Sequence, residues 1–222
     1  MKTTLLTPET DGNAVKTAAE LIRAGEVVGM PTETVYGLAA NALNGEAVKK
    51  IFLAKGRPQD NPLIVHIADF EQIYDLCPAV PPQAKQLADA FWPGPLTMIV
   101  PKGGCIPDEV SCGLDTVGIR LPSHPMARAL IRESGVPLAA PSANTSGRPS
   151  TTTAAHVMHD MDGKIAAVLD GGACGVGVES TVITLALERP RLLRPGGITL
   201  EQLRSVLGEV DVDRALYEKI GD

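Results

Sequence analysis

Several stretches of the chain place apolar residues three and four positions apart, the spacing of one face of an α-helix. Residues 14–24 (AVKTAAELIRA) follow this spacing and end before Gly25, a residue that commonly caps the C-terminus of a helix. In a second such stretch, Val48, Ile51 and Phe52 share one face. The pattern predicts helices at 14–24, 45–55, 81–91, 124–134, 151–160 and 199–207.

Short apolar runs without helical spacing lie between these stretches. Residues 63–67 (LIVHI) form a compact run that suits a buried strand. The runs predict strands at 26–30, 63–67, 96–100, 116–121, 136–140, 166–170, 181–185 and 191–194. Because strands and helices mix without strict alternation, we expect an α/β fold of the α+β type. Its open, twisted, mixed β-sheet would be flanked by helices, and a barrel or a doubly wound sheet is disfavoured.

No internal repeat, low-complexity tract or linker divides the 222 residues. A chain of this length is sufficient for one sizeable α/β domain. We therefore expect a single domain over residues 1–210, followed by a loosely held polar tail over residues 211–222.

The composition describes an ordinary globular protein, with 44% hydrophobic and 21% charged residues. Aromatic residues make up only 3%, so the core must be built from Val, Leu, Ile and Ala. No apolar run approaches the ~20 residues that a membrane-spanning helix needs. The N-terminus (MKTTLLTPETDGN) lacks a basic region followed by an apolar stretch, so we expect no secretory signal and a cytoplasmic protein.

Neither the cysteines nor the histidines show the spacing of a metal site. His156 and His159 are three positions apart on a predicted helix, but no third ligand stands near them, and a solvated helix face is the better interpretation. The cysteines lack a C-x-x-C spacing, and we expect reduced thiols at Cys77, Cys105, Cys112 and Cys174. The sequence therefore predicts no metal held by protein ligands.

The familiar nucleotide-binding and hydrolase motifs are missing. There is no G-x-x-x-x-G-K-[ST] loop, no H-E-x-x-H and no G-x-S-x-G, and residues 175–177 (GVG) lack the third glycine of the dinucleotide pattern. The formal net charge of −6 argues against broad coating by nucleic acid, which needs Lys and Arg to neutralise phosphates. A local anion site is compatible with this charge.

Polar residues gather instead in short segments at predicted strand ends and turns, where sites are usually built. PTETVYGL at 31–38 carries hydroxyls, a carboxylate and a phenol; its simpler interpretation is a strand-to-helix connection in which Thr32 or Thr34 caps the helix. KGRP at 55–58, followed by NPLIVHI at 61–67, offers two cations in an irregular turn. A point charge beside a fork-shaped donor suits a polyphosphate, and a basic surface turn is an equal alternative.

Three further segments are rich in turn residues. PSANTSGRPS at 141–150 follows an apolar strand and brings together hydroxyls and an amide, although such a cluster also suits a generic turn. GGACGVGVEST at 171–181 could bring backbone N–H groups close to a ligand or make a tight hairpin. RPGG at 194–197 ends a strand with an arginine.

Taken in order, PTETVYGL, KGRP…NPLIVHI, TVGIRLP, PSANTSGRPS, ESTVI and LLRPGG resemble the YrdC/TsaC family of threonylcarbamoyl-AMP synthases. The resemblance covers nearly all of residues 15–208, and the family's K-x-R…S-x-N signature stands as Lys55-x-Arg57 and Ser142-x-Asn144. It implies a twisted mixed sheet around a positively lined cavity. Longer members add a linker and a second domain, so this chain resembles the single-domain type.

The resemblance also implies the reaction and its site. L-Threonine, bicarbonate and ATP would give threonylcarbamoyl-AMP and pyrophosphate for the threonylcarbamoyladenosine modification of tRNA. ATP-binding roles are implied for Lys55, Arg57, Asn61, Thr116, Ser142, Asn144, Ser150 and Arg194. Among these, Lys55 and Arg57 would be catalytic. Threonine-binding roles are implied for Thr34, His66, Arg120, Ala140 and Ser180, with His66 expected to bind rather than to act as a base.

The implied cofactor is Mg²⁺ that arrives with ATP and is held largely by phosphate oxygens and water. The implied partner is the tRNA-modifying transferase complex that receives the adenylate; weak tRNA binding is compatible with this, and no membrane is involved. Two alternatives stay open. An RNA-binding module could grip tRNA or double-stranded RNA in a basic cleft, although the net charge and the scarce aromatics weigh against it. A carbamoyl-adenylate-forming domain is the other, although such domains belong to much longer chains.

Overall fold

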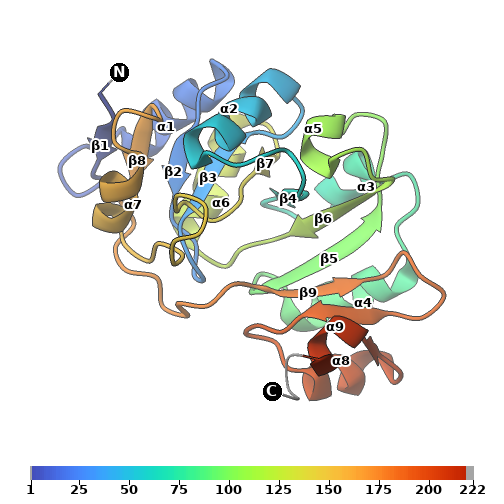
Figure 1. Ribbon diagram of the computed structural model, residues 1–222. Helices are drawn as coiled ribbons and strands as arrows, with labels where there is room; N and C mark the ends of the chain where they lie inside the picture. Colours follow the sequence, from blue (N-terminus) through green and yellow to red (C-terminus); the bar gives the residue numbers. More distant parts are fainter. Residues whose placement is uncertain (1, 219–222) are drawn as a thin grey trace.

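The computed structural model describes residues 2–218 (Figure 1). The helices are α1 (Ala14–Arg23), α2 (Gly45–Lys55), α3 (Gln72–Leu76), α4 (Pro82–Phe91), α5 (Asp108–Ser111), α6 (Pro125–Ser134), α7 (Ala154–Met161), α8 (Leu200–Leu207) and α9 (Arg214–Glu218). The strands are β1 (Thr4–Leu6), β2 (Val28–Met30), β3 (Gly37–Asn41), β4 (Ile64–His66), β5 (Leu96–Pro101), β6 (Thr116–Arg120), β7 (Leu138–Ala139), β8 (Ala167–Leu169), β9 (Thr181–Thr184), β10 (Arg191–Arg194) and β11 (Asp211–Val212). Each helix and strand predicted from the pattern is present, with ends that differ by a few residues.

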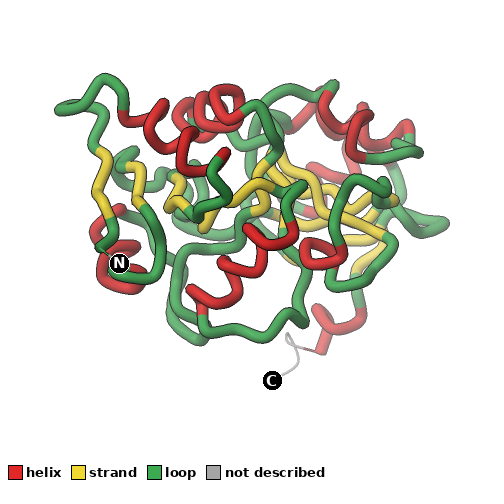
Figure 2. The backbone as a smooth tube through the Cα atoms, turned by 90° about the horizontal axis from the view of Figure 1, so that it is seen from above, coloured by secondary structure: helices red, strands yellow, loops and turns green. Residues whose placement is uncertain are grey.

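The described strands form one sheet in the order β1-β8-β2-β3-β7-β4-β6-β5-β9-β10-β11. Parallel and antiparallel neighbours are equally frequent, with β4 and β6 parallel and β5 and β6 antiparallel. Figure 2 shows the strands as a middle layer with helices on both sides. The expected open, mixed sheet flanked by helices is confirmed.

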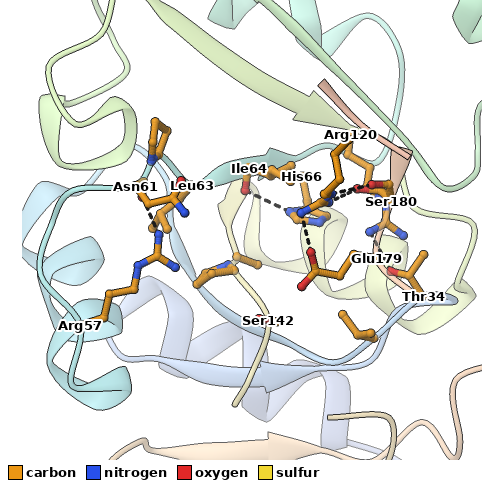
Figure 3. A pocket seen from close by; sticks show the side chains of 15 residues that line it. Thr34, Arg57, Asn61, Leu63, Ile64, His66, Arg120, Ser142, Glu179 and Ser180 are labelled. Atoms are coloured by element: carbon orange, nitrogen blue, oxygen red, sulfur yellow. Dashed lines mark hydrogen bonds and ion pairs between the residues drawn. The ribbon is translucent and has the colours of Figure 1, made fainter. Parts of the chain in front are cut away.

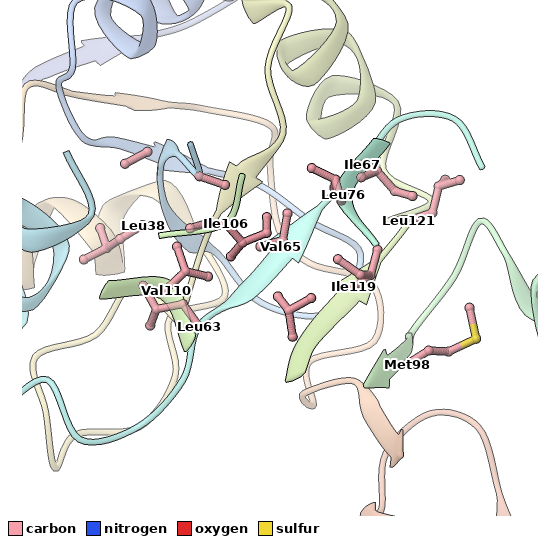
Figure 4. Packing of buried hydrophobic residues seen from close by; sticks show 14 of the residues in the cluster. Leu38, Leu63, Val65, Ile67, Leu76, Met98, Ile106, Val110, Ile119 and Leu121 are labelled. Carbon is pink, nitrogen blue, oxygen red and sulfur yellow. The ribbon is translucent and has the colours of Figure 1, made fainter. Parts of the chain in front are cut away.

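Side chains of the strands alternate between two hydrophobic clusters on opposite faces of the sheet, because successive residues of a strand point to opposite sides. In β8, Val168 belongs to the larger cluster, whereas Ala167 and Leu169 belong to the smaller one. The larger cluster is covered by α2, α3, α4, α5, α7 and α8, and the smaller one by α1 and α6. Val65 of β4 and Ile119 of β6, paired in register, lie at the centre of the view of the larger cluster (Figure 4).

Helix α2 carries signals at both ends that lead the chain into the KGRP segment. The side chain of Asn44 accepts hydrogen bonds from two backbone N–H groups of the first turn. At the other end, Gly56 adopts a left-handed conformation with φ 62°, which favours glycine. The N–H of Arg57 then donates to the carbonyl of Phe52, and the chain turns sharply away from the helix axis.

The interpretation of PTETVYGL as a strand-to-helix connection is wrong. The segment joins β2 to β3, which pair antiparallel with Gly29 opposite Leu38. Thr32 and Thr34 therefore cap no helix; the Thr32 hydroxyl instead bonds within the turn, donating to the carbonyl of Val35 and accepting from the N–H groups of Thr34 and Val35. The pattern did not indicate β3 because its sequence, GLAAN, contains no β-branched or aromatic residue.

Other differences lie at short or terminal elements. The helix predicted at 151–160 begins at Ala154, because Thr153 is extended and its side chain accepts from the N–H of His156. Residues 211–222, expected to be a tail, include β11, which pairs in parallel with β10, and α9; residues 219–222 lie outside the described residues. None of the described helices is long and apolar enough to cross a membrane.

Candidate active site

A cavity of about 180 Å³ lies where β4 and β6 end, beside the β2–β3 turn and the segment that leads into β9 (Figure 3). Among the described residues, the charged side chains that line the cavity are those of Arg57, Arg120, Arg194 and Glu179. His66 also lines the cavity and is treated below as neutral. Three guanidinium groups against one carboxylate make the lining positive, as the resemblance implied.

Nine of the predicted site residues line this cavity: Thr34, Arg57, Asn61, His66, Arg120, Ala140, Ser142, Ser180 and Arg194. They come from segments that are far apart in sequence and meet because β4, β6 and β7 are adjacent in the sheet. Figure 3 shows Arg57 and Asn61 at one end of the cavity and Arg120 and Ser180 at the other. The structure therefore divides the predicted residues between two ends of one cavity.

Arg120 is the most deeply buried cation of the site, with 4% of its surface exposed. Its Nη2 lies 2.5 Å from Oε1 of Glu33, and its Nη1 donates to Oγ1 of Thr34 at 2.9 Å. Burial lowers the pKa of Arg120, and the Glu33 carboxylate opposes that shift. Nε of Arg120 is buried and has no hydrogen-bond partner among the described residues. Nη1 and Nη2 each carry a second N–H, and because Arg120 lines the cavity its guanidinium can still donate to a ligand.

Glu33 holds Arg120 in place from the other side. Its Oε2 accepts from the backbone N–H of Ser123 at 3.1 Å, three residues beyond the end of β6. The carboxylate therefore has protein donors on both oxygens, which compensates for its burial beside a guanidinium. The sequence analysis named the Glu33 carboxylate within PTETVYGL but assigned it no role.

His66 ends β4 directly opposite Arg120 in the parallel pairing of β4 and β6. Its Nδ1 lies 3.2 Å from the carbonyl oxygen of Ile64, and since a carbonyl only accepts, Nδ1 carries the proton. Burial, together with the charge of Arg120, lowers the pKa of His66 to about 3. The imidazole is therefore neutral near pH 7 and a poor proton acceptor, which supports the expected binding role.

Ser180 and Arg194 form a connected group at the same end of the cavity. Arg194 donates from Nε to the carbonyl of Ser180 at 3.0 Å and from Nη2 to its Oγ at 3.1 Å. Nη1 of Arg194 lies 2.5 Å from Oε2 of Glu179, whose Oε1 accepts from the hydroxyl of Ser150 at 3.1 Å. Gly196 permits this packing, because a Cβ there would collide with the backbone of residues 179–181.

Glu179 is the second carboxylate to which the sequence analysis gave no role. It connects two predicted nucleotide-binding residues, Ser150 and Arg194, without being one of them. Both Glu33 and Glu179 precede a predicted site residue directly in the sequence. Their position inside the PTETVYGL and ESTVI segments was the available signal, but a sequence does not show which arginine a carboxylate faces.

Lys55 lies behind the cavity wall and is 2% exposed. Its Nζ donates to the carbonyl oxygens of Ser142 and Asn144, the latter at 2.8 Å, so it supports the PSANTSGRPS segment from below. Burial, and then the charge of Arg57, lower the pKa of Lys55 to about 8. Asn144 is also buried: its Nδ2 donates to the carbonyls of Thr145 and Arg148, while its Oδ1 has no partner in the described structure.

Arg57 is the accessible cation of the KGRP turn. Its Nη2 donates to the carbonyl of Asn61 at 2.9 Å, and its guanidinium lies 5.8 Å from the centre of the Phe52 ring. Thr116 lies elsewhere: it begins β6, whereas Arg120 ends it, which separates the two by roughly 13 Å along the strand. The structure does not bring Thr116 to the cavity, and its predicted ATP contact has no support from this geometry.

No group of three or more His, Cys, Asp or Glu side chains that could hold a metal ion exists within residues 2–218. The cysteines form no disulfide over the same range. His156 and His159 lie on α7, as the pattern predicted. The geometry therefore points to a site built from cations and hydroxyls.

The model of the Sua5/YciO/YrdC family, described as "Telomere recombination", matches residues 20–196. The chain belongs to the Sua5/YciO/YrdC family. This confirms the resemblance that the ordered segments indicated.

Individual members of the Sua5/YciO/YrdC family are similar over almost the whole chain. Threonylcarbamoyl-AMP synthase of Bacillus subtilis (strain 168) is 58% identical over 214 residues, which cover 95% of this chain and 61% of that protein. The protein of the same name from Pyrococcus abyssi is 54% identical over 208 residues, or 94% of this chain and 61% of that protein. The chain thus spans about three fifths of the length of these curated relatives.

The crystal structure of P. abyssi Sua5 complexed with L-threonine has the same fold. It aligns with a TM-score of 0.93 and 51% sequence identity, and the alignment covers 98% of this chain and 64% of that chain. The fold expected for the family is therefore confirmed by a solved structure.

Proposed function

We propose that this chain catalyses the synthesis of threonylcarbamoyl-AMP from L-threonine, bicarbonate and ATP. The observation that carries the proposal is the guanidinium of Arg120, which lines the cavity and keeps a second N–H on each terminal nitrogen beside those given to Thr34 and Glu33. A carboxylate of an amino acid would accept from this group in a charge-assisted hydrogen bond. The names of the relatives and the threonine complex of P. abyssi Sua5 support L-threonine as that amino acid.

The amino-acid end of the cavity would consist of Arg120, Thr34, His66, Ser180 and the backbone at Ala140. These residues offer a guanidinium for the carboxylate and small polar groups for the amine and the hydroxyl. All are buried, so polar contacts made there are worth more than they would be in water.

The nucleotide end would hold the triphosphate through cations and hydroxyls. Arg57 and Arg194 line the cavity and can contact phosphate oxygens directly. Lys55 would act on the same end by fixing the carbonyls of the loop that carries Ser142 and Asn144, and by adding positive charge behind the cavity wall. Asn61 and Ser150 would complete the contacts to ATP, and Thr116 would contribute only after a rearrangement.

The reaction would proceed in two steps. The amine of threonine attacks the carbon of bicarbonate or CO2, water leaves in the case of bicarbonate, and an N-carboxylate forms. An oxygen of that carboxylate then attacks the α-phosphorus of ATP, and pyrophosphate leaves with the electron pair of the broken P–O bond. Neither step needs a covalent nucleophile on the protein, so the contribution of Arg57 and Arg194 is to position the phosphates and to neutralise their charge.

Mg²⁺ fits this site only as an ion that ATP brings. Mg²⁺ typically keeps several waters and binds one or two carboxylates together with substrate phosphates. The carboxylate that lines the cavity, Glu179, already accepts from Arg194 and Ser150. The metal would add positive charge at the phosphates, held chiefly by their oxygens and by water.

The adenylate would pass to a tRNA-modifying transferase complex, and we place the reaction in the cytoplasm, where ATP and tRNA are found. The proposal is tested by pyrophosphate release from ATP–Mg²⁺ with threonine and bicarbonate omitted in turn. Pyrophosphate should form only when both are present, and Ser180→Ala should raise the KM for threonine while the exposed-helix control Ser205→Ala should not. Formation of ADP and phosphate, or release of pyrophosphate without threonine, would show that the proposal is wrong.

A further inference from the structure

The hydroxyls around the cavity differ in how far the structure fixes their hydrogen bonds. Oγ1 of Thr32 donates its one proton to the carbonyl oxygen of Val35 at 2.6 Å and accepts from the backbone N–H groups of Thr34 and Val35, at 3.2 and 3.3 Å. Its two lone pairs are therefore already used, and the 2.9 Å contact with Oγ1 of Thr34 does not require the Thr34 proton. Thr34 accepts from Arg120 and can still act as donor or acceptor toward a ligand.

At Ser180, on the opposite wall, the direction of each hydrogen bond can be assigned. Its Oγ accepts from Nη2 of Arg194 and lies 2.8 Å from Oγ1 of Thr97 on β5. Thr97 is fully buried, and Ser180 is the one acceptor within reach of its hydroxyl in the described structure. If Ser180 donated to Thr97, the proton of Thr97 would be buried without an acceptor, which is costly. Thr97 therefore donates, and the Ser180 proton is left for the cavity.

We propose that Thr97 is a positioning residue that makes Ser180 a hydrogen-bond donor toward the amino acid. Thr97 does not line the cavity, so it acts through Ser180, which it contacts.

This polarity orients an amino acid, and in that respect the inference rests on the proposed function. A carboxylate accepts hydrogen bonds and an ammonium group donates them. The carboxylate therefore turns toward Ser180 and the terminal nitrogens of Arg120, which offer donors. The opposite placement, with the ammonium group at Ser180, would set donor against donor.

The test is a double-mutant cycle on L-threonine binding, measured by titration calorimetry on the full chain without ATP. Thr97→Val is nearly isosteric and removes only the hydroxyl, and we expect it to weaken threonine binding by about five- to tenfold. Thr97→Ser keeps the hydroxyl and should bind within about twofold of wild type. In the Ser180→Ala background, Thr97→Val should have no further effect, because Thr97 acts only through Ser180.

A purely structural role for Thr97 predicts a different result, in which the losses from Thr97→Val and Ser180→Ala add. Additive losses, or wild-type affinity in Thr97→Val, would overturn the inference for Thr97. The far-UV circular dichroism spectrum and the Tm of every variant should match those of the wild type within a few degrees, which confirms folding. If the wild type binds no L-threonine, both the proposed substrate and this inference are wrong. If the wild type binds L-threonine and Thr97→Val binds it equally well, only the inference for Thr97 is wrong.

Discussion

Replacing Arg57 with alanine removes the accessible cation of the KGRP turn. One donor of its guanidinium is committed to the carbonyl of Asn61, and the group lies over the Phe52 ring, so its orientation is set before a ligand arrives. The loss of a hydrogen bond to a charged group costs ~1.5–3 kcal/mol, or about 10- to 150-fold in affinity. Because Arg57 is only partly buried, water screens the interaction, and we expect the lower part of this range, about 10- to 30-fold.

The measurement is the affinity for α,β-methylene-ATP in the presence of Mg²⁺, by titration calorimetry at low and at moderate salt. Lys49→Ala and Lys50→Ala are the matched controls. Both lysines lie nearby on α2, but Lys49 pairs with Glu46 and Lys50 with Glu26, outside the cavity. They should bind the nucleotide within about twofold of wild type. Equal losses in all three variants would mean that diffuse positive charge, not Arg57, holds the phosphates.

Lys55 has a pKa lowered by burial to about 8 from 10.5, so the unfolded chain binds more protons between these values. The free energy of unfolding of the wild type, minus that of Lys55→Met, should therefore rise with pH between these two values, by up to about 3 kcal/mol. Urea titrations at a series of pH values measure this difference. A difference that does not change with pH contradicts the lowered pKa. His66, whose pKa is lowered to about 3, should stay neutral near pH 7. The pH profiles of kcat/KM for the wild type and for His66→Gln should therefore have the same shape near pH 6.5. L-Serine should react about 10- to 200-fold less efficiently than L-threonine, and L-valine far less again, because valine leaves the buried polar group that pairs with the threonine hydroxyl without a partner. A competition assay in which valine matches serine would refute this order.

The hydrophobic pattern predicted the elements that bury a continuous apolar face. Helix α2 is an example, because Val48, Ile51 and Phe52 all lie in the larger cluster. The pattern missed β3, since its alanines suit a helix as well as a strand, and only antiparallel pairing with β2 and β7 holds them extended. It also missed α5, which is too short to show a helical period.

The candidate site could be predicted as a set of segments but not as a geometry. The segments correctly supplied Arg120 and His66, which the parallel pairing of β4 and β6 places side by side. They did not indicate that Lys55 donates to loop carbonyls, because that depends on the turn after α2. Nor did they indicate the proton direction that Thr97 sets at Ser180, which requires the distance between two buried hydroxyls.

The central claim is that the chain joins threonine and bicarbonate to the α-phosphate of ATP. The most direct test is mass spectrometry of the product formed from ATP–Mg²⁺, L-threonine and ¹³C-labelled bicarbonate. We predict threonylcarbamoyl-AMP that carries one heavy carbon, together with an equal amount of pyrophosphate. A threonyl-AMP without the added carbon, or ADP and phosphate in place of pyrophosphate, would contradict the account.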